Sequence, residues 1–103
     1  MRPSKWEIWY AKVAYEDDPT QIKKRPVLII DDRVCYILSF KITSRAPRLN
    51  FPGEYKLVKW SEAGLHKPST VRTSKRLRMI ETDFVYKIGR LHPVDILGII
   101  RII

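Results

Sequence analysis

Basic and hydroxyl side chains are concentrated in residues 67–79, which read KPSTVRTSKRLRM, with five basic side chains and no acidic one. Arginine and lysine form charge-assisted hydrogen bonds with phosphate, and hydroxyl groups complete such contacts. This residue pattern predicts a surface that binds a chain of phosphates. The side chains that could do so are Arg25, Lys41, Thr43, Ser44, Arg45, Ser69, Thr70, Arg72, Thr73, Ser74 and Lys75.

The charge of the whole chain favours the same kind of partner. Lysine and arginine number 20 against 11 aspartates and glutamates, which gives a formal net charge of +9 over 103 residues. Such a surface attracts polyanions, although a net charge can also serve solubility alone. The aromatic content of 11% indicates a folded domain rather than a disordered basic tail.

RNA is the polyanion that these residue types could also cleave. Its 2′-hydroxyl is a built-in nucleophile, so cleavage needs a base for that hydroxyl and a cation that stabilises the pentacoordinate phosphorus. Arginine suits the second task because it is always charged and binds phosphate in a bidentate manner. Candidates for the base are the acids Glu16, Asp17 and Asp18 and the two histidines. These residue types favour RNA binding and permit RNA cleavage.

Other chemistries lack their usual residues. The four glycines are scattered singly, so no glycine-rich phosphate loop is present. His66 and His92 have no recognised zinc spacing, and Cys35, the only cysteine, is expected to be a buried structural thiol. We therefore predict no metal site and no cofactor.

Short alternating segments predict a mostly β fold in a single domain, residues 1–103. Strands are expected at 6–13, 25–30, 33–44, 54–58 and 67–79, with a last strand before His92. Two long loops, 14–24 and 45–53, separate them, and a helical turn is expected at 61–63. Such a set of strands is typical of a strongly bent antiparallel sheet or open barrel.

A terminal helix is predicted from residue 93 to about 102, with Pro93 in its first turn. Its polar positions are only Asp95, Gly98 and Arg101, so the rest of its circumference is apolar. A helix of this kind is buried on more than one side. A second copy of the chain could cover it, or the helix could close an open barrel end, and the sequence does not separate the two.

The place of the protein in the cell is indicated by two segments, residues 1–13 and 27–30. The longest aliphatic run, residues 27–30, is too short to cross a bilayer, and the first residues lack the apolar core of a signal peptide. We expect a cytoplasmic protein with no membrane partner.

Five segments in order along the chain resemble the PemK/MazF family of bacterial toxin–antitoxin ribonucleases. They span nearly the whole chain and read WEIWYAKV, KKRPVLII, KITSR, AGLHKPSTVR and YKIGRLHPVDI. The resemblance implies an SH3-like open barrel with a C-terminal helix, a homodimer, and a metal-independent endoribonuclease that cuts single-stranded RNA to a 2′,3′-cyclic phosphate and a 5′-hydroxyl. It also implies a cognate antitoxin whose acidic tail occupies the RNA groove, and binding to operator DNA only as the toxin–antitoxin complex.

The resemblance also assigns roles to residues. Arg25 and Thr43 match family positions that contact and orient the scissile phosphate, and Ser44 follows in the same motif. Arg72 matches an arginine that assists the leaving group and stabilises the transition state. Two positions on, where one branch of the family has an aspartate base, this chain has Ser74.

Without that aspartate, the base is expected to be Asp17, Asp18 or His66. The expected RNA-binding residues are Lys24, Ser44, Arg45, Ser74, Lys75, Arg76 and Arg78. Two alternatives remain. One is a catalytically inactive relative that only binds RNA or the antitoxin. The other is a DNA gyrase poison of similar fold, which no sequence feature favours.

Overall fold

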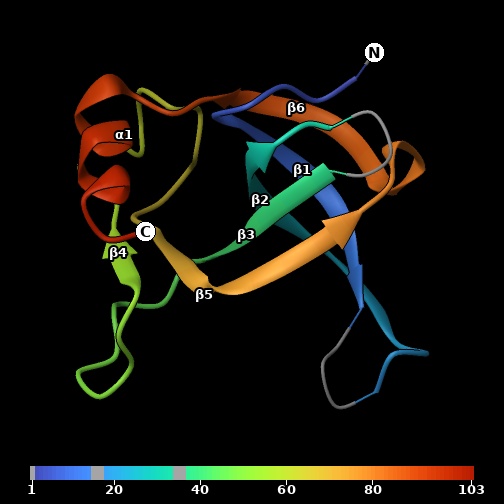
Figure 1. Cartoon of the computed structure of the whole chain (residues 1–103), viewed down its shortest axis with the longest axis horizontal. Helices are drawn as coiled ribbons and strands as arrows, with labels where there is room; N and C mark the ends of the chain where they lie inside the picture. Colours follow the sequence, from blue (N-terminus) through green and yellow to red (C-terminus); the bar gives the residue numbers. More distant parts are fainter. Residues whose placement is uncertain (1, 15–17, 34–36) are drawn as a thin grey trace.

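A six-stranded antiparallel sheet and one C-terminal helix make up the computed structural model, which describes residues 2–14, 18–33 and 37–103 (Figure 1). The strands lie in the order β4-β5-β3-β2-β1-β6. The predicted mostly β class is confirmed. The elements are β1 (Glu7–Ala14), β2 (Ile22–Asp31), β3 (Ile37–Thr43), β4 (Glu54–Lys56), β5 (Thr70–Met79), a 3-10 turn η1 (Glu81–Asp83), β6 (Phe84–Arg90) and α1 (Pro93–Ile100).

Two local expectations were wrong. Strand β2 begins at Ile22, inside the predicted loop 14–24, because β1 continues far enough to pair with it up to Ala14. Strand β5 begins at Thr70, so Lys67 to Ser69 precede the strand.

The helical turn expected at 61–63 is found as hydrogen-bonded turns. The amide of Ala63 donates to the carbonyl of Lys59 at 3.2 Å, and the amide of Gly64 donates to the carbonyl of Ser61 at 3.0 Å.

The sheet buries apolar side chains on both faces, because successive residues of a strand point to opposite sides. We call these sides the first and second face. The first-face cluster comprises Ile8, Leu28, Phe40, Ile42, Leu57, Ala63, Leu65, Val71, Leu91 and Ile99. The second-face cluster comprises Trp9, Ala11, Val13, Val27, Ile29 and Met79. Along β1, Ile8 therefore packs in the first-face cluster and Trp9 in the second-face cluster.

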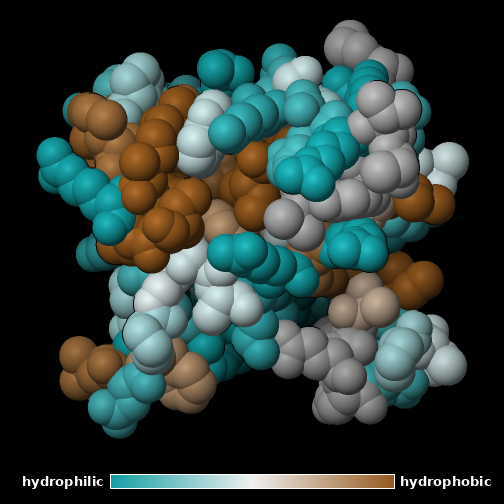
Figure 2. Space-filling view, in the orientation of Figure 1, coloured by the Kyte–Doolittle hydropathy of each residue, from teal (hydrophilic) through white to brown (hydrophobic). Residues whose placement is uncertain are grey.

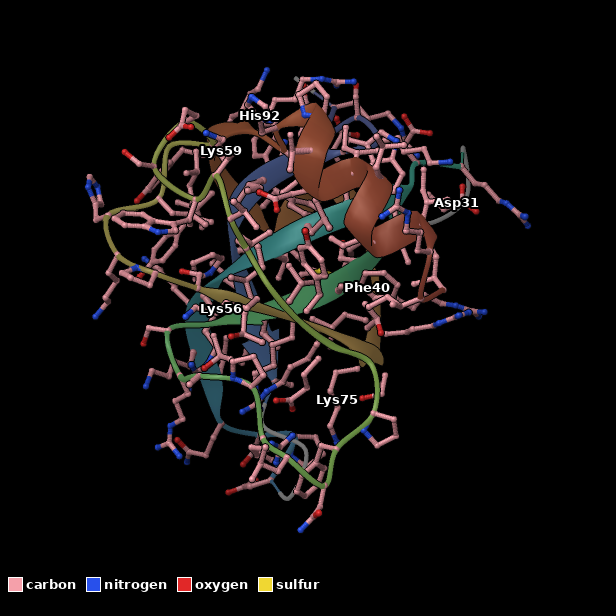
Figure 3. The ribbon with its side chains drawn as sticks, turned by 90° about the vertical axis from the view of Figure 1, so that its left-hand side faces the viewer. Asp31, Phe40, Lys56, Lys59, Lys75 and His92 are labelled. Carbon is pink, nitrogen blue, oxygen red and sulfur yellow. The ribbon has the colours of Figure 1, made fainter. Side chains whose placement is uncertain are left out.

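Helix α1 covers the first-face cluster (Figures 1 and 3). His92 caps its start, since the imidazole Nδ1 accepts a hydrogen bond from the amide of Val94 at 3.1 Å. Gly98 lies directly against the ring of Tyr55, where a Cβ atom would collide with the ring. Glycine therefore lets the helix approach β4 closely.

Asp95 anchors this helix, although its pattern suggested only a polar helix position. Its carboxylate is fully buried and accepts hydrogen bonds from the Tyr55 hydroxyl at 2.8 Å and from the amides of Val58 at 2.9 Å and Lys59 at 2.8 Å. Burial, together with the hydrogen bond from the Tyr55 hydroxyl to Asp95, raises the pKa of Tyr55 to about 12. The hydroxyl therefore stays protonated at neutral pH and remains a donor.

The two sides of α1 differ in how deeply they are buried. One side of α1 closes the first-face cluster through Ile99, as a cap does. Its other side leaves Val94, Leu97 and Ile100 about half exposed. No helix in the described part of the chain is long and apolar enough to cross a membrane.

Replacing Asp95 with alanine tests the anchor. Three donors lose their acceptor, and an unsatisfied buried donor costs about 1–3 kcal/mol. We expect the free energy of unfolding to fall by about 3 kcal/mol, measured by urea denaturation. The matched control is Glu62→Ala, because that acid is half exposed and forms an ion pair with Lys59 on the surface; we expect a loss below about 1 kcal/mol. Equal losses in the two variants would contradict the anchor.

Candidate functional site

Strand β5 brings the candidate catalytic side chains together because it pairs along both edges. On one edge Arg72 faces Lys41 and Thr70 faces Thr43, and on the other Arg72 faces Glu54. Neighbouring strands lie about 4.8 Å apart, so directly paired side chains can touch.

Arg25, Thr43 and Arg72 lie on the same face. Continuing the β2–β3 register by two residues from Val27 and Lys41 sets Arg25 opposite Thr43. Ile42 and Val71 point into the first-face cluster, so their neighbours Thr43 and Arg72 point to the second face. The three predicted catalytic residues therefore lie on one face of three neighbouring strands, and Thr43 is diagonal to Arg72 across the β3–β5 pairing.

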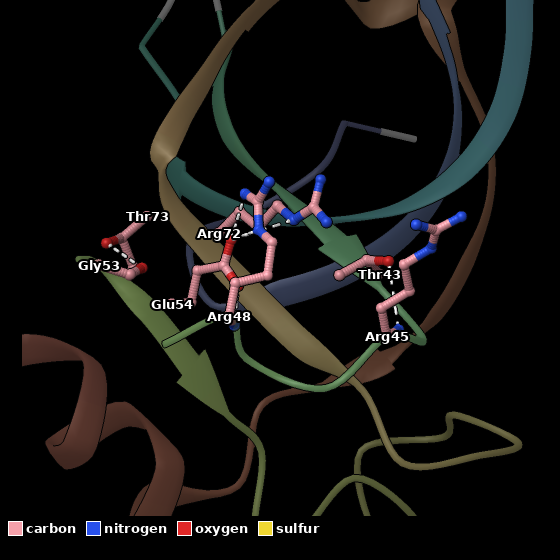
Figure 4. Close-up of polar contacts among 7 residues, drawn as sticks. All are labelled: Thr43, Arg45, Arg48, Gly53, Glu54, Arg72 and Thr73. Atoms are coloured by element: carbon pink, nitrogen blue, oxygen red, sulfur yellow. Dashed lines mark hydrogen bonds and ion pairs between the residues drawn. The ribbon is translucent and has the colours of Figure 1, made fainter. Parts of the chain in front are cut away.

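The surroundings of Thr43 suit a group that orients an anion. Its side chain is 8% exposed, and its Oγ1 accepts a hydrogen bond from the amide of Arg45 at 3.3 Å (Figure 4). Arg45 and Ser44 follow the end of β3 and are exposed. Arg25 is half buried on β2.

Glu54 forms the centre of an ion cluster that sequence reasoning missed. Its Oε2 accepts a hydrogen bond from the Nε of Arg48 at 2.9 Å and a second from the Nη2 of Arg48, and its Oε1 accepts from the Arg48 amide at 2.9 Å. The Nε of Arg72 lies 3.5 Å from Oε2. Figure 4 shows both guanidinium groups converging on this carboxylate.

The ion cluster is largely shielded from water. The side chain of Glu54 is 2% exposed and that of Arg72 is 14% exposed. The Arg48 hydrogen bonds and, to a smaller extent, the charge of Arg72 hold the pKa of Glu54 below its usual value of 4.5. Glu54 therefore stays ionised at neutral pH. One sequence signal could have revealed it, since it is the only acidic residue between Asp32 and Glu62.

The predicted RNA-binding residues do not all share the face of Arg72. The β3–β5 pairing jumps from Lys41 with Arg72 to Phe40 with Arg76, so residues 73–75 form a bulge. Beyond the bulge Arg76 lies over the ring of Phe40 at 6.0 Å, on the first face. Arg78 alternates to that face as well, because Leu77 and Met79 belong with the second-face cluster.

The remaining predicted RNA-binding residues are spread around the strand ends. Lys24 pairs with Lys12, is exposed and alternates away from Arg25. Ser74 is exposed within the bulge, and Lys75 is half buried there.

The candidate bases do not lie together either. Asp17, like Glu16, lies outside the described residues. Asp18 is exposed, and its Oδ1 accepts a hydrogen bond from the Thr20 hydroxyl at 2.6 Å. It lies in the turn of the β1–β2 hairpin, whose second strand carries Arg25.

His66 lies elsewhere. It lines a pocket of about 420 Å³ together with Tyr10, Pro26 and Tyr86. Tyr10 and Pro26 point to the first face, since their neighbours in β1 and β2 point to the second. His66 is thus on the opposite side of the sheet from Arg25 and Arg72.

Among the described residues, no group of three or more histidine, cysteine, aspartate or glutamate side chains is placed to hold a metal ion. Cys35 lies outside the described residues, so its expected burial stays a prediction.

Comparison with known proteins supports the resemblance. A family model described as PemK-like, MazF-like toxin of type II toxin-antitoxin system matches residues 4–102. The chain belongs to this family. Among solved structures, the Mycobacterium tuberculosis toxin MazF-mt6 matches it with a TM-score of 0.68 and 22% sequence identity, over 92% of this chain and 89% of that chain. At this identity the likeness shows the fold alone. No curated protein sequence matches the chain.

Membership in the PemK/MazF family assigns a coarse function. At the level of the family, the chain is a toxin of the endoribonuclease type, with RNA as its substrate and an antitoxin as its partner.

Proposed function

We propose that this chain is a metal-independent, sequence-selective endoribonuclease toxin that cleaves single-stranded messenger RNA in the cytoplasm. The observation that supports the proposal is that Arg25, Thr43 and Arg72 lie on the same face of three neighbouring strands. Two permanent cations and a hydroxyl on one face suit a bound phosphodiester, because arginine offers paired donors to phosphate oxygens.

The chemistry follows from the RNA itself. The 2′-hydroxyl gives its proton to a base, its oxygen forms a bond to phosphorus, and the P–O5′ bond breaks. The leaving O5′ takes up a proton, so the products are a 2′,3′-cyclic phosphate and a 5′-hydroxyl. Arg25 and Thr43 orient the phosphate. Arg72 stabilises the charge that builds on the phosphoryl and leaving oxygens, which is the largest contribution that a fixed cation makes to such a reaction.

Asp18 is the base that we assign among the described residues. It belongs to the hairpin that carries Arg25, whereas His66 faces the other side of the sheet. Asp18 is exposed, so its carboxylate is accessible to an RNA strand that crosses the hairpin.

RNA binding extends beyond the reacting phosphate. Ser44 and Arg45 follow the end of β3, and Ser74 and Lys75 lie in the bulge of β5, so we assign these four residues to RNA next to the cleaved bond. Lys24, Arg76 and Arg78 belong to the first face, so we assign them to RNA farther from the cleaved bond. An acidic antitoxin tail would compete for the same cations, and operator DNA would bind only to the toxin–antitoxin complex.

We further propose that two copies of the chain associate through α1. Val94, Leu97 and Ile100 are exposed on its outer side, and Ile102 and Ile103 extend this apolar surface. Figure 2 shows hydrophobic surface gathered in the area of this helix. A two-fold dimer is the commonest way to cover such a patch.

Cleavage of a mixed single-stranded RNA in the presence of a chelator tests the activity. We expect cyclic phosphate ends, and we expect Arg72→Ala to lower kcat about a hundredfold or more, because it removes the main stabilising cation. Arg90→Ala is the matched control, because Arg90 is an exposed arginine on β6 to which we assign no RNA contact, and it should leave kcat nearly unchanged.

Three outcomes would contradict these assignments. A pure protein that binds RNA and leaves it intact would instead be a non-catalytic relative. Intact RNA with inhibited DNA supercoiling would indicate a gyrase poison. Full activity of Arg72→Ala would refute the role given to Arg72.

The base assignment has its own pair of variants. Asp18→Asn should lower kcat about a hundredfold, because general-base help is worth about that much or more. The affinity for an uncleavable 2′-O-methyl RNA should not fall, since the substitution removes a negative charge. His66→Ala should leave cleavage unchanged. A loss in His66→Ala with none in Asp18→Asn would reverse the assignment.

The dimer is tested by placing a charge on the apolar side of α1. Leu97→Asp should convert the dimer to a monomer, because a buried unpaired carboxylate is costly to desolvate. The measurement is sedimentation equilibrium. Leu49→Asp is the matched control, since Leu49 is fully exposed in the loop before β4. A wild-type monomer, or an unchanged dimer in Leu97→Asp, would contradict the proposed interface.

A further inference from the structure

We propose that Glu54 is a positioning residue that holds Arg72 in place for catalysis. This inference rests on the proposed ribonuclease function. It deepens that function, because it gives Arg72 a carboxylate partner on the neighbouring strand β4. Ser74, two residues further along β5, is exposed in the bulge and carries no charge.

The contact between Glu54 and Arg72 is built into the sheet. The two residues are direct partners in the β4–β5 pairing, and the Arg72 Nε lies 3.5 Å from Oε2. Among the described residues, the Arg72 Nε is buried without a hydrogen-bond partner. The attraction to Glu54 is therefore the interaction that compensates this buried N–H group. It restrains the side chain through Nε, and we assign the remaining N–H groups of the guanidinium to the substrate.

Glu54 is in turn fixed from the other side by Arg48. Both carboxylate oxygens accept hydrogen bonds from that residue, and the Arg48 guanidinium lies over the ring of Phe51 at 3.6 Å. This arrangement ties the loop before β4 to the strand. A carboxylate that is buried, ionised and paired with two arginines is a poor proton acceptor. Glu54 therefore orients Arg72 and does not serve as the base.

The charge of Glu54 has opposite effects on binding and on catalysis. It offsets one of the two arginine charges, so it weakens the attraction of the site for any phosphate. It also fixes the guanidinium where charge develops during the reaction, and such preorganisation raises kcat. Loss of the carboxylate charge should therefore lower kcat without weakening RNA binding.

Glu54→Gln separates these effects, since glutamine keeps the shape and can still accept a hydrogen bond from the Arg48 amide. We expect kcat to fall about tenfold to a hundredfold, the cost of misplacing a catalytic group by about 1 Å. The Kd for uncleavable 2′-O-methyl RNA should stay equal or become tighter. A parallel loss of binding and kcat would indicate a merely structural role. An unchanged kcat would also overturn the proposal.

Two further variants locate the effect. Arg48→Gln breaks the link to the loop and leaves the Glu54–Arg72 pair, so it should retain most of kcat. If it reproduces the defect of Glu54→Gln, the loop and not Arg72 is responsible. Glu54→Gln combined with Arg72→Ala should be no slower than Arg72→Ala alone, because Glu54 acts through Arg72. An additional loss in the double variant would contradict this.

A measurement on the wild-type protein needs neither activity nor a folded variant. The Nε–H resonance of Arg72 in a nitrogen–proton NMR spectrum should shift as the pH falls through the pKa of Glu54, below 4.5. A resonance that does not titrate there would refute the contact. If the wild type cleaves no RNA while the resonance titrates, the proposed function fails and the positioning contact stands.

Discussion

The pairing of β5 along both edges is the constraint on which the site depends. A strand paired on one edge only would present Arg72 to either Lys41 or Glu54. Here it lies between them, with a cation on one side and a carboxylate on the other. The bulge at residues 73–75 then reverses the alternation, so that the later arginines of the same strand serve the other face. One strand thus distributes its cations over two surfaces.

The site holds arginines close together in a chain whose net charge is +9, so the repulsion between their charges must be offset. Like charges at hydrogen-bonding distances repel strongly in a shielded environment. Glu54 reduces this repulsion because it lies between Arg48 and Arg72 and is almost fully shielded. The low pKa that results keeps the carboxylate ionised over the physiological range. We infer that the charges of Arg48 and Arg72 are balanced in part by one fixed counter-charge, the carboxylate of Glu54.

The two faces of the sheet have different tasks. The first face carries the larger apolar cluster, closed by α1 and anchored by the buried carboxylate of Asp95. This arrangement satisfies a charge inside the protein with three donors and leaves the outer side of the helix apolar. The second face carries a smaller cluster and, at its edge, the candidate site. The larger core therefore lies on the face opposite the proposed catalytic residues.

The sequence by itself determined the family, the mostly β class and the positions of most strands, because these follow from ordered motifs and from alternation within short segments. It also singled out Arg25, Thr43 and Arg72. The tertiary structure decided which residues meet. It pairs Glu54 with Arg72, places His66 on the opposite side of the sheet from Arg72, and sets Arg76 on the first face. The reason is physical. Alternation is a local property of one strand, whereas register and bulges depend on partners distant in the chain.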